Sequence, residues 1–379
     1  MTAVPASPTT LILSQRRVSA KVYQCCLYEF EDVIASLTDA DMIMPVTEGE
    51  GSPWQTLART ARNRVARATG RTHAIRTTVS TESVRRDYDV FFAAFMFPSQ
   101  ALVLNHLQGW VERAKTKICF LGEIWLRQFE DPRERQFLEI LKAFDHIFVH
   151  TASSVQALAA FTGRPCHVLP GAVDAVRFCP GRPAPPRCVD VYSMGRRSEV
   201  THRALLAQAE GGGSFYLYDT ASGFDVIDPR EHRRLLANLI KRSRYFIAYR
   251  HNANISGITG GQEELGARLF EGTAGGAVLL GQPPDCDAFR EHFDWDDAVV
   301  PIALDAYDIA QSLAELDAQP ERIAKIRQLN VVNSLLRHDW AHRWQRILEV
   351  ADLPPGPKLP KRVDELRFLA AHVRADRAP

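Results

Sequence analysis

Short apolar runs alternate with helical segments along most of the chain, and this alternation limits the fold more than any other feature of the sequence. Runs such as Tyr88–Phe97 and His146–His150 are almost continuously apolar, which is typical of strands buried on both faces. Segments between them, such as Asp131–Phe144, have the length and spacing of helices. Strands that alternate with helices of this length pair in parallel. The sequence therefore predicts an α/β protein with parallel sheets.

The same alternation continues to about residue 300, and mostly helical segments follow it. We expect further strands at Thr10–Leu13, Lys117–Leu121, His167–Leu169, Cys188–Met194, Phe215–Tyr218, Tyr245–Tyr249 and Val299–Ile302. We expect further helices at Glu31–Leu37, Pro98–Trp110, Ser153–Phe161 with Thr151 or Ser153 as its cap, Arg230–Lys241, Asp287–His292, Ala306–Leu316, Glu321–Leu335, Trp340–Val350 and Lys361–Arg374.

The composition of the chain argues against some classes of function. The chain has 379 residues, which is long enough for two domains with full cores. Its net charge of +1 argues against a nucleic-acid-binding protein driven by bulk charge. Seven cysteines without metal-binding spacing fit a reducing cytoplasm. The N-terminus does not read as a secretory signal, and the most apolar stretch, Val90–Leu107, is too polar to span a membrane.

The stretch from Ile255 to Gly281 combines a glycine loop, a helical run with two carboxylates, and a glycine pair that leads into an apolar strand. Glycine accepts a positive φ, so the pair is a natural helix stop. The helix N-terminus after the loop presents N–H groups and a partial positive charge, which suit a phosphate. On an ideal helix the two carboxylates lie about 80° apart, so their spacing alone indicates no joint role. The residues are the loop glycines Gly257, Gly260 and Gly261, the carboxylates Glu263 and Glu271, the pair Gly275 and Gly276, and the strand Ala277–Leu280.

The segment Arg268-Leu269-Phe270-Glu271, followed by Ala274-Gly275-Gly276, resembles the donor-site signature of GT-B glycosyltransferases of the group 1 or family-4-like set. It is similar to a bacterial branch that reads R-x-F-E-x4-G. The resemblance implies that Glu271 accepts hydrogen bonds from the ribose hydroxyls of a nucleotide sugar and that Glu263 faces the donor hexose. A carboxylate suits this role because it can hold a diol with both oxygens. The same resemblance assigns Gly260, Gly261 and Thr273 to the donor side.

The strand at Cys188–Met194 is followed by Gly195-Arg196-Arg197. In the family that this chain resembles, a Gly-Arg pair and a later basic residue grip the donor diphosphate. Arg196 matches the first position, which makes it a catalytic candidate together with Glu263, and His202 or Arg203 matches the second. The planar arginine side chain fits phosphate oxygens well. A solvated arginine pair at a strand end remains the alternative. The further donor-site candidates are Arg197 and Arg250.

Leu169-Pro170-Gly171-Ala172-Val173-Asp174, with Phe178 and Pro180 after it, resembles the turn that ends the first domain of these enzymes. The proline-rich segment that follows reads as a connector. We therefore expect residues 1–182 to bind the acceptor, residues 183–352 to bind the nucleotide sugar, and residues 353–379 to form a linker and a helix that could pack back on the first domain. The resemblance implies two Rossmann-like domains that face each other across a cleft.

Two side chains in the first half are acceptor-side candidates, because ligands bind beyond the carboxyl ends of parallel strands. Glu123 follows the strand at Lys117–Leu121, and His150 ends the strand at His146–His150. Either residue could equally be a cap or an ion-pair partner. The relatives carry a glycine-rich loop after the first strand, whereas this chain has Ser14-Gln15-Arg16-Arg17. No catalytic residue is therefore assigned to that loop.

Residues 54–76 form a basic segment with six arginines, and no acidic residue occurs between Ser52 and Thr81. The apolar side chains within it recur at helical spacing. Such a helix can lie on an anionic membrane or guide an anionic acceptor. We favour the alternative that it is a surface helix packed on its domain by this small apolar face. The apolar residues are Trp54, Leu57, Ala61, Val65 and Ala68, and the basic ones are Arg59, Arg62, Arg64, Arg67, Arg71 and Arg76.

Two Asp-x-Asp matches, Asp285–Asp287 and Asp294–Asp296, raise the competing hypothesis of a metal-dependent glycosyltransferase. Such short matches are common, so we expect transfer without a metal or other cofactor. The sequence thus predicts a cytoplasmic, bacterial-type hexosyltransferase. It would move a sugar from a nucleoside-diphosphate sugar to a glycan, lipid-linked or small-molecule acceptor, with retention at the anomeric carbon. The alternatives are an inverting enzyme and a degenerate domain that binds a nucleotide or glycan without turnover.

Overall fold

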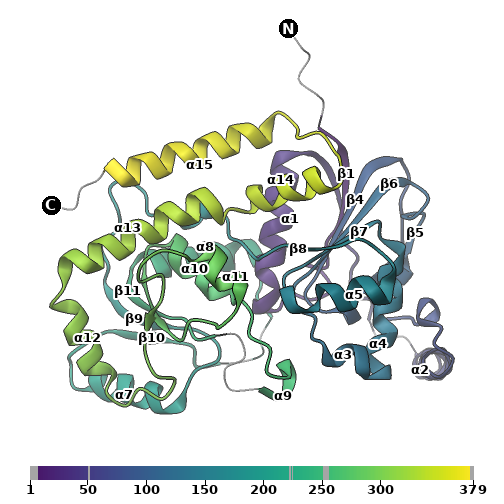
Figure 1. The fold of residues 1–379 in the computed structure, drawn as a ribbon. Coiled ribbons are helices and arrows are strands. Elements are labelled where there is room, and N and C mark those ends of the chain that lie inside the picture. The colour runs from purple at the N-terminus through teal and green to yellow at the C-terminus, as the bar shows by residue number, and fades with distance from the viewer. Residues whose placement is uncertain (1–6, 50–51, 222, 224, 251–255, 376–379) are drawn as a thin grey trace, which may run out of the picture. The chain divides into compact units, whose positions relative to one another are not determined.

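The protein folds into two compact α/β units (Figure 1). A computed structural model describes residues 7–49, 52–221, 223, 225–250 and 256–375. The first unit comprises the chain up to Pro170 together with Asp225–Pro229 and Trp344–Pro360. The second comprises Gly171–Phe224, Arg230–Arg343 and the chain from Lys361 onward. This division differs from the expected boundaries after residues 182 and 352. Within the described ranges, no helix is long and apolar enough to cross a membrane.

The first unit is built on a six-stranded parallel sheet in the order β2-β1-β4-β6-β7-β8. Phe92 points to one face and meets Phe30 and Trp344, with ring centroids 5.3 and 5.8 Å apart. The neighbouring Phe91 points to the other face and meets Phe144 at 6.2 Å. Both faces are therefore buried, as the continuous apolar runs indicate. The strands are β1 (Thr9–Leu13), β2 (Asp39–Ile43), β4 (Tyr88–Phe95), β6 (Ala114–Leu121), β7 (His146–Val149) and β8 (Cys166–Val168), and β3 (Glu82–Ser83) pairs separately with β5 (Leu107–Gln108).

The first helix of this unit is longer than expected, and the later ones are shorter. The helices are α1 (Cys25–Leu37), α2 (Pro53–Ala68), α3 (Arg127–Glu130), α4 (Pro132–Leu138) and α5 (Val155–Thr162), with 3₁₀ turns at Val22–Gln24, Thr72–Ala74, Pro98–His106, Glu139–Ala143 and Ala152–Ser154. The predicted helix Pro98–Trp110 is present in part, as a 3₁₀ helix at Pro98–His106 that leads into β5. The Asn105 amide donates to two backbone carbonyls, Thr72 O and Ile75 O, both at 2.9 Å. These contacts with another segment hold the chain in tighter turns than an α-helix has.

The predicted cap of the helix near residue 153 is wrong. Neither Thr151 nor Ser153 caps α5, whose N-cap is Ser154 without a side-chain capping bond. The hydroxyls of Thr151 and Ser154 instead donate to the carbonyl of Ile124, at 2.9 and 2.7 Å. They fasten the loop after β6 to the loop after β7, which lies beside it at the same sheet edge.

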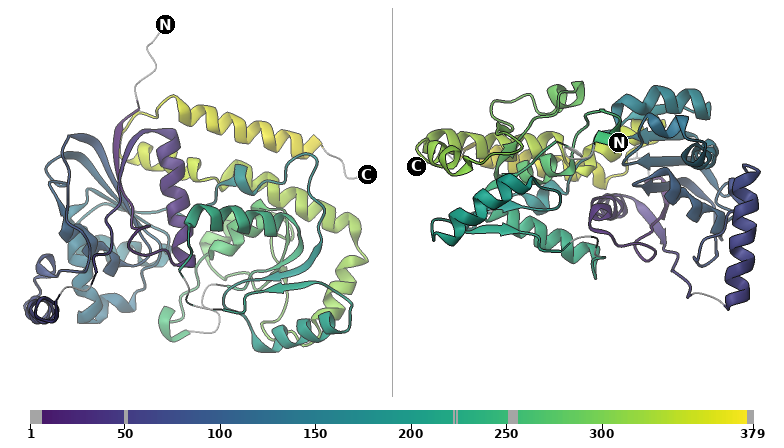
Figure 2. Two further views of the ribbon diagram at one scale, coloured as in Figure 1. Left: turned by 180° about the vertical axis from the view of Figure 1, so that it is seen from behind. Right: turned by 90° about the horizontal axis from the view of Figure 1, so that it is seen from below.

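The second unit is built on a five-stranded parallel sheet in the order β10-β9-β11-β12-β13. Figures 1 and 2 show helices on both faces of this sheet. The strands are β9 (Val189–Ser193), β10 (Tyr216–Tyr218), β11 (Ser243–Ile247), β12 (Val278–Gly281) and β13 (Val300–Pro301). The helices are α6 (Ala175–Phe178), α7 (Glu199–Glu210), α8 (Pro229–Lys241), α9 (Ser256–Thr259), α10 (Ala267–Ala274), α11 (Asp287–His292), α12 (Ile309–Asp317) and α13 (Pro320–Arg337), and α14 (Trp340–Val350) and α15 (Lys358–Ala375) close the chain.

Glycines let α10 and β12 pack closely on β11. Helix α10 ends at Gly275, and Gly276 follows with φ +65°, so the predicted glycine stop is confirmed. A Cβ on Gly272 would lie 2.2 Å from Leu279 Cδ2, and a Cβ on Gly281 would lie 2.1 Å from the carbonyl oxygen of Ala248. The close approach of helix and strand therefore depends on these positions having no side chain.

Histidine 338 gives the second unit a predicted acid sensitivity. Its imidazole is fully buried against Phe293 and Phe270, with ring centroids 4.9 and 5.2 Å away. Burial holds the pKa of His338 well below its ordinary value of 6.5. The unfolded chain therefore binds the proton more readily, so the stability that the neutral ring contributes is present above pH 6.5 and is lost as the pH falls below it.

We expect this loss to be about 1 kcal/mol for the first pH unit below 6.5. Urea unfolding of the wild type and of His338→Phe at about pH 7.5 and about pH 5.5 measures it. The variant should lose less stability between the two pH values, since the other histidines contribute equally to both proteins. Equal losses in the two proteins would contradict the prediction.

Candidate functional site

The strand order of the second unit locates a candidate site before any side chain is considered. The order reverses at β9, whose neighbours are β10 on one side and β11 on the other. In open parallel sheets, ligands bind beyond the carboxyl ends of the strands at such a switch point. The segments there are the turn Gly195–Arg197 after β9 and Arg250 shortly after β11. Helix α10 connects β11 to β12, so its N-terminus lies at the same edge of the sheet.

The turn after β9 is held by Asp219, which follows β10. Gly195 has φ +70°, and its N–H donates to Asp219 Oδ2 at 2.6 Å. Arg197 donates to the Asp219 carbonyl at 2.8 Å and lies 5.3 Å from the centre of the Tyr218 ring. A side chain on Gly195 would collide with the guanidinium of Arg268, 2.5 Å from the Cβ position. The geometry of this turn therefore lets the first turn of α10 pack against it.

Two arginines meet at this point. Arg268 Nη1 donates to the carbonyl of Arg196 at 3.3 Å, and the Arg196 side chain is exposed. Burial lowers the pKa of Arg268, Glu271 and Asp219 counteract this effect, and the charge of Arg196 adds to it. Two guanidinium groups therefore lie close together beside an uncapped helix start, since Gly266 at the N-cap has no side chain. Such a combination favours an anion.

Glu271 lies on the next turn of α10 and is 5% exposed. Its carboxylate forms a short ion pair with Arg233 of α8, whose side chain is equally buried and lies 4.9 Å from the centre of the Phe178 ring. The charge of Glu271 also affects the pKa of the Tyr192 phenol in β9. Burial is the main reason that the pKa of Tyr192 is raised, and the charges of Asp219 and Glu271 raise it further. The structure thus places Glu271, Arg268 and Arg196 in one charged cluster at the switch point.

The predicted helical run with both carboxylates is wrong in one respect, because Glu263 lies in the loop before α10 and not on a helix. Glu263 forms a short ion pair with Arg250, and its Oε2 accepts from the Asp285 N–H at 2.7 Å. It therefore fastens the segment after β11 to the segment after β12. The segment between residues 281 and 284 contains Gly281, Pro283 and Pro284 and forms no helix. The contacts of Glu263 therefore help to hold these loops in place.

Gly260 and Gly261 both have positive φ, of +63° and +83°. A Cβ at either position would meet no atom within 4 Å, so the backbone conformation and not a close neighbour accounts for these glycines. The Gly261 N–H donates to Thr259 Oγ1 at 3.3 Å at the end of α9. The turn directs the chain from α9 toward Glu263.

Two sequence candidates lie apart from this cluster. Thr273 is fully buried, and its hydroxyl donates to Leu269 O at 2.7 Å and accepts from Ser334 Oγ at 3.0 Å. Arg203 is exposed on α7 and pairs with Glu199 at 3.0 Å. We leave both residues out of the proposed site.

His202 is the other sequence candidate for the basic residue that binds the donor diphosphate, and its side chain is also taken up in packing. It is buried against Tyr216, with its Nδ1 3.0 Å from the phenol oxygen, and burial lowers its pKa. A neutral imidazole in this position supplies no positive charge for a phosphate.

The first-unit candidates lie at one edge of the first sheet. Glu123 follows β6 and His150 follows β7, and these neighbouring strands pair in parallel with Leu121 opposite Val149. Glu123 is half-buried, and its charge helps to raise the pKa of Tyr23, after burial as the main cause. Both candidates therefore have the position expected from the sequence, at the carboxyl edge of the sheet.

The aspartates of both Asp-x-Asp matches form ion pairs with basic side chains. Asp285 and Asp287 both pair with Arg290 at 2.7 Å, and Asp294 forms a short ion pair with Arg337. Within the ranges that the structure describes, no group of three or more acidic, histidine or cysteine side chains is placed to hold a metal ion.

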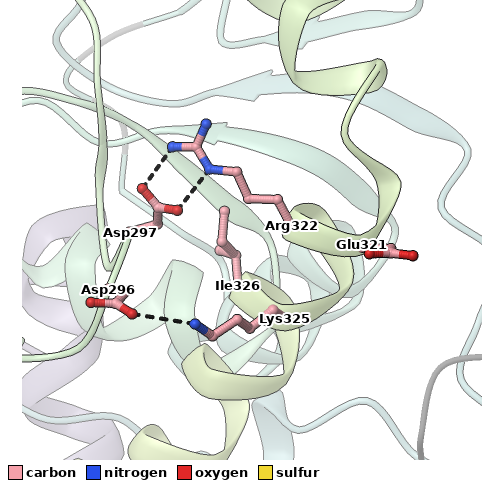
Figure 3. Close-up of a pocket in the computed structure, with 6 residues that line it drawn as sticks. All are labelled: Asp296, Asp297, Glu321, Arg322, Lys325 and Ile326. Atoms are coloured by element: carbon pink, nitrogen blue, oxygen red, sulfur yellow. Dashed lines mark hydrogen bonds and ion pairs between the residues drawn. The ribbon is translucent and has the colours of Figure 1, made fainter.

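The last of these aspartates lies in a surface hollow of about 580 Å³. Asp297 forms a two-pronged pair with Arg322 at 2.7 Å for each contact, and Asp296 pairs with Lys325 at 3.3 Å. Both aspartates precede β13, so the hollow lies at the amino edge of the sheet, opposite the switch point. The lining residues are Asp296, Asp297, Glu321, Arg322, Lys325 and Ile326 (Figure 3).

Sequence reasoning missed three residues beside the charged cluster, namely Arg233, Asp219 and Tyr192. One signal for Arg233 is present, because α8 is strongly amphipathic and places this arginine among its buried positions, beside Leu236 and Ala237. A charged residue on the buried face of a helix indicates a buried partner. Which carboxylate serves as that partner follows only from the fold.

Known proteins resemble this chain in fold and, over part of its length, in sequence. Residues 200–349 match a family model described as glycosyl transferase-like. No curated protein matches the chain by sequence at a significant level. The matched segment contains Arg233, Arg250, Glu263, Arg268 and Glu271, and it begins just after Arg196.

Three solved structures are similar over nearly the whole chain. The Anabaena protein HepE, in complex with UDP and glucose, has 12% identity and a TM-score of 0.52, and the match covers 90% of this chain and 99% of that one. An alpha-glucosyltransferase, in complex with UDP and a 13-mer DNA containing an HMU base, has 9% identity and a TM-score of 0.53, with 91% and 99% covered. An α,α-trehalose-phosphate synthase (UDP-forming) from Burkholderia vietnamiensis has 12% identity and a TM-score of 0.51, with 91% and 99% covered.

At such low identity these structures establish the fold, which is the GT-B fold with two Rossmann-like α/β units. The expected fold class is thus confirmed, while the family-4-like branch remains a proposal. The chain thus has the GT-B fold, and its residues 200–349 are similar to a glycosyl transferase-like family.

Proposed function

We propose that the protein transfers a hexose from a nucleoside-diphosphate sugar to an acceptor, and that the second unit binds the donor at the β9–β11 switch point. The observation that carries this proposal is the charged cluster of Arg196, Arg268 and Glu271. It combines two guanidinium groups with one carboxylate where a parallel sheet binds its ligand. Diphosphate and ribose require these same two kinds of partner.

Each member of the cluster has a distinct role in this proposal. Arg196 and Arg268 bind the diphosphate, with Arg197 and Arg250 as further cations along the same edge. Glu271 accepts from the ribose hydroxyls, and Arg233 holds its carboxylate in place. Arg233 contacts Oε1 of Glu271, and we assign Oε2 to a ribose hydroxyl.

The chemistry proposed is departure of the nucleoside diphosphate from the anomeric carbon. Negative charge develops on the leaving phosphate, and Arg196, Arg268 and the N-terminus of α10 stabilise it, so no metal ion is required. Gly260 and Gly261 bring the backbone close to the sugar, and Glu263 contacts the donor hexose. The likeness to the family-4-like set supports retention at the anomeric carbon, with inversion as the alternative.

The acceptor would bind at the carboxyl edge of the first sheet, with Glu123 and His150 as candidate contacts. A glycan, a lipid-linked glycan or a small molecule fits this acceptor site. We also propose that the protein is located in the cytoplasm. HepE binds UDP and UDP-glucose, and the trehalose-phosphate synthase is UDP-forming, which supports testing UDP donors first.

A second candidate is a protein that binds a nucleotide or glycan without turnover. One observation favours it. The loop after β1 carries no glycine, and its Arg16 is tied to Glu31 at 3.0 Å and to Asp32 at 2.9 Å. This arginine is therefore engaged within its own unit, and the loop differs from the glycine-rich loop that catalytic relatives carry.

A donor panel separates the two candidates. Purified protein is titrated with UDP-, GDP- and ADP-glucose by calorimetry, and slow donor hydrolysis is followed by chromatography with and without EDTA. We expect one nucleotide to bind and its sugar to be hydrolysed equally well with EDTA. Binding without hydrolysis or transfer to any acceptor would support the second candidate. Absence of binding to every nucleotide sugar would overturn the donor site itself.

A further inference from the structure

Helix α2 presents its apolar side chains to solvent, which is the reverse of the arrangement expected from the sequence. Trp54 is 79% exposed, Leu57 is 60% exposed and Val65 is 62% exposed. The predicted packing of this helix through that apolar face is therefore wrong. Figure 2 shows α2 along the outside of the first unit.

The opposite side of α2 attaches the helix to its unit. Ala66 is buried in a small cluster with Ile75 and Leu102. The Asn63 amide both donates to the carbonyl of Arg76 at 2.7 Å and accepts from its N–H at 2.9 Å. Polar bonds and one alanine thus fix the helix, and this arrangement leaves the apolar face outward.

Arginines flank the exposed face on both sides. On an ideal helix, Trp54, Leu57, Ala61, Val65 and Ala68 fall within about 60° of one line. Arg62 and Arg64 then lie about 80° to either side of that line, and both are exposed. No acidic residue lies between Ser52 and Thr81 to offset their charge.

We propose that α2 is an interfacial helix that docks the protein on an anionic lipid bilayer. The apolar face, defined as Trp54, Leu57, Ala61, Val65 and Ala68, would enter the boundary between headgroups and acyl chains. The flanking Arg62 and Arg64 would reach the lipid phosphates with their charged ends while their stems cover the apolar face. Tryptophan suits such a boundary, because one side of its ring system is apolar and its N–H is polar.

The charge pattern favours an anionic bilayer over two other partners, a second copy of the chain and a nucleic acid. A second copy of the chain would bring two acid-free arginine rows together, and like charges facing each other oppose association. A nucleic acid would satisfy the arginines but would leave Leu57 and Val65 exposed. An anionic bilayer satisfies both sets of side chains at once. The proposal does not rest on the donor site, because docking requires neither nucleotide nor transfer.

Vesicle sedimentation with the full chain tests this docking. Protein is mixed with vesicles of phosphatidylcholine alone and of phosphatidylcholine with phosphatidylglycerol, at low and at high salt, without any nucleotide. We expect binding to the anionic vesicles only, and weaker binding at high salt because salt screens the arginines.

Two variants separate charge from apolar contact. Arg62→Glu with Arg64→Glu should lower partitioning by at least about 30-fold, since each arginine near an anionic surface contributes about a factor of five. Trp54→Ser with Leu57→Ser should lower it by at least about tenfold. The matched control is Arg133→Glu with Arg234→Glu, which makes the same charge change at exposed positions elsewhere and should have little effect on partitioning.

The replaced side chains are exposed, so all three variants should unfold at the wild-type temperature, which a thermal scan checks. Failure of the wild type to sediment with anionic vesicles would overturn the proposal. So would unchanged binding in both α2 variants, or an equal loss in the control. Sedimentation velocity adds one more outcome: a dimer that Trp54→Ser with Leu57→Ser dissociates would show that a second copy covers this face instead.

Discussion

Replacing either member of the buried Arg233–Glu271 pair is expected to destabilise the protein by about 3–5 kcal/mol. Each single variant, Arg233→Met or Glu271→Leu, leaves the other charge buried without its partner, and this is far more costly than loss of a surface ion pair. The double variant should recover most of the loss, because two apolar side chains of similar volume can fill the same space. Urea unfolding of the four proteins measures the cycle.

Donor binding separates structural from functional use of this pair. Glu271 is proposed to hold the ribose, so the double variant should regain stability while its nucleotide affinity stays lost. A double variant that regains both would show that the pair only supports the fold. The matched control is the exposed pair Arg203 and Glu199 on α7, whose removal should change stability by less than about 1 kcal/mol.

All strands of the two main sheets except the partly exposed edge strand β2 could be predicted from the sequence, because these parallel strands are largely buried. A strand covered on both faces must be apolar at nearly every position, and that pattern is visible without a structure. Strand β4 begins at Tyr88 as predicted and ends at Phe95, two residues before the predicted end. Such end positions depend on the length of the paired strand β6, which no local pattern reveals.

Segments fixed by contacts from afar could not be predicted. The run from Pro98 has helical composition, but Asn105 bonds to the backbone of residues 72 and 75 and tightens its turns. Helix α2 has a clear apolar periodicity, yet Asn63 and Ala66 decide which side meets the unit. A periodic pattern shows that two faces differ, and the surroundings determine which face is buried.

For the same reason, only part of the candidate site could be predicted from the sequence. Glycine and arginine after a strand, and the segment around Glu271, could be recognised because they are short and contiguous. Arg233 could not, because it lies 38 residues before its partner and on a different helix. The position of Glu263 in a loop, tied to Arg250 and to the Asp285 N–H, likewise depends on loops that meet only in the folded unit.

Arg268→Ala is expected to lower kcat/KM for the best nucleotide sugar by about 100- to 1000-fold. Its guanidinium is proposed to stabilise the departing diphosphate, and loss of one such preorganised donor has an effect of this size. Arg268→Lys keeps the charge but loses the planar pair of donors, so we expect an intermediate loss of about tenfold. Hydrolysis and transfer rates over a range of donor concentrations measure both variants.

The same assay distinguishes a specific contact from general positive charge. Arg196→Ala should behave like Arg268→Ala, since both guanidinium groups lie at the turn after β9. Arg203→Ala removes an equal charge from exposed α7 and should change kcat/KM by less than about twofold. Equal losses in Arg203→Ala and Arg268→Ala would mean that general positive charge, and not a specific contact at the turn after β9, accounts for the effect. A loss confined to Arg196 and Arg268 would instead tie leaving-group stabilisation to the one point where β9, β10 and α10 converge.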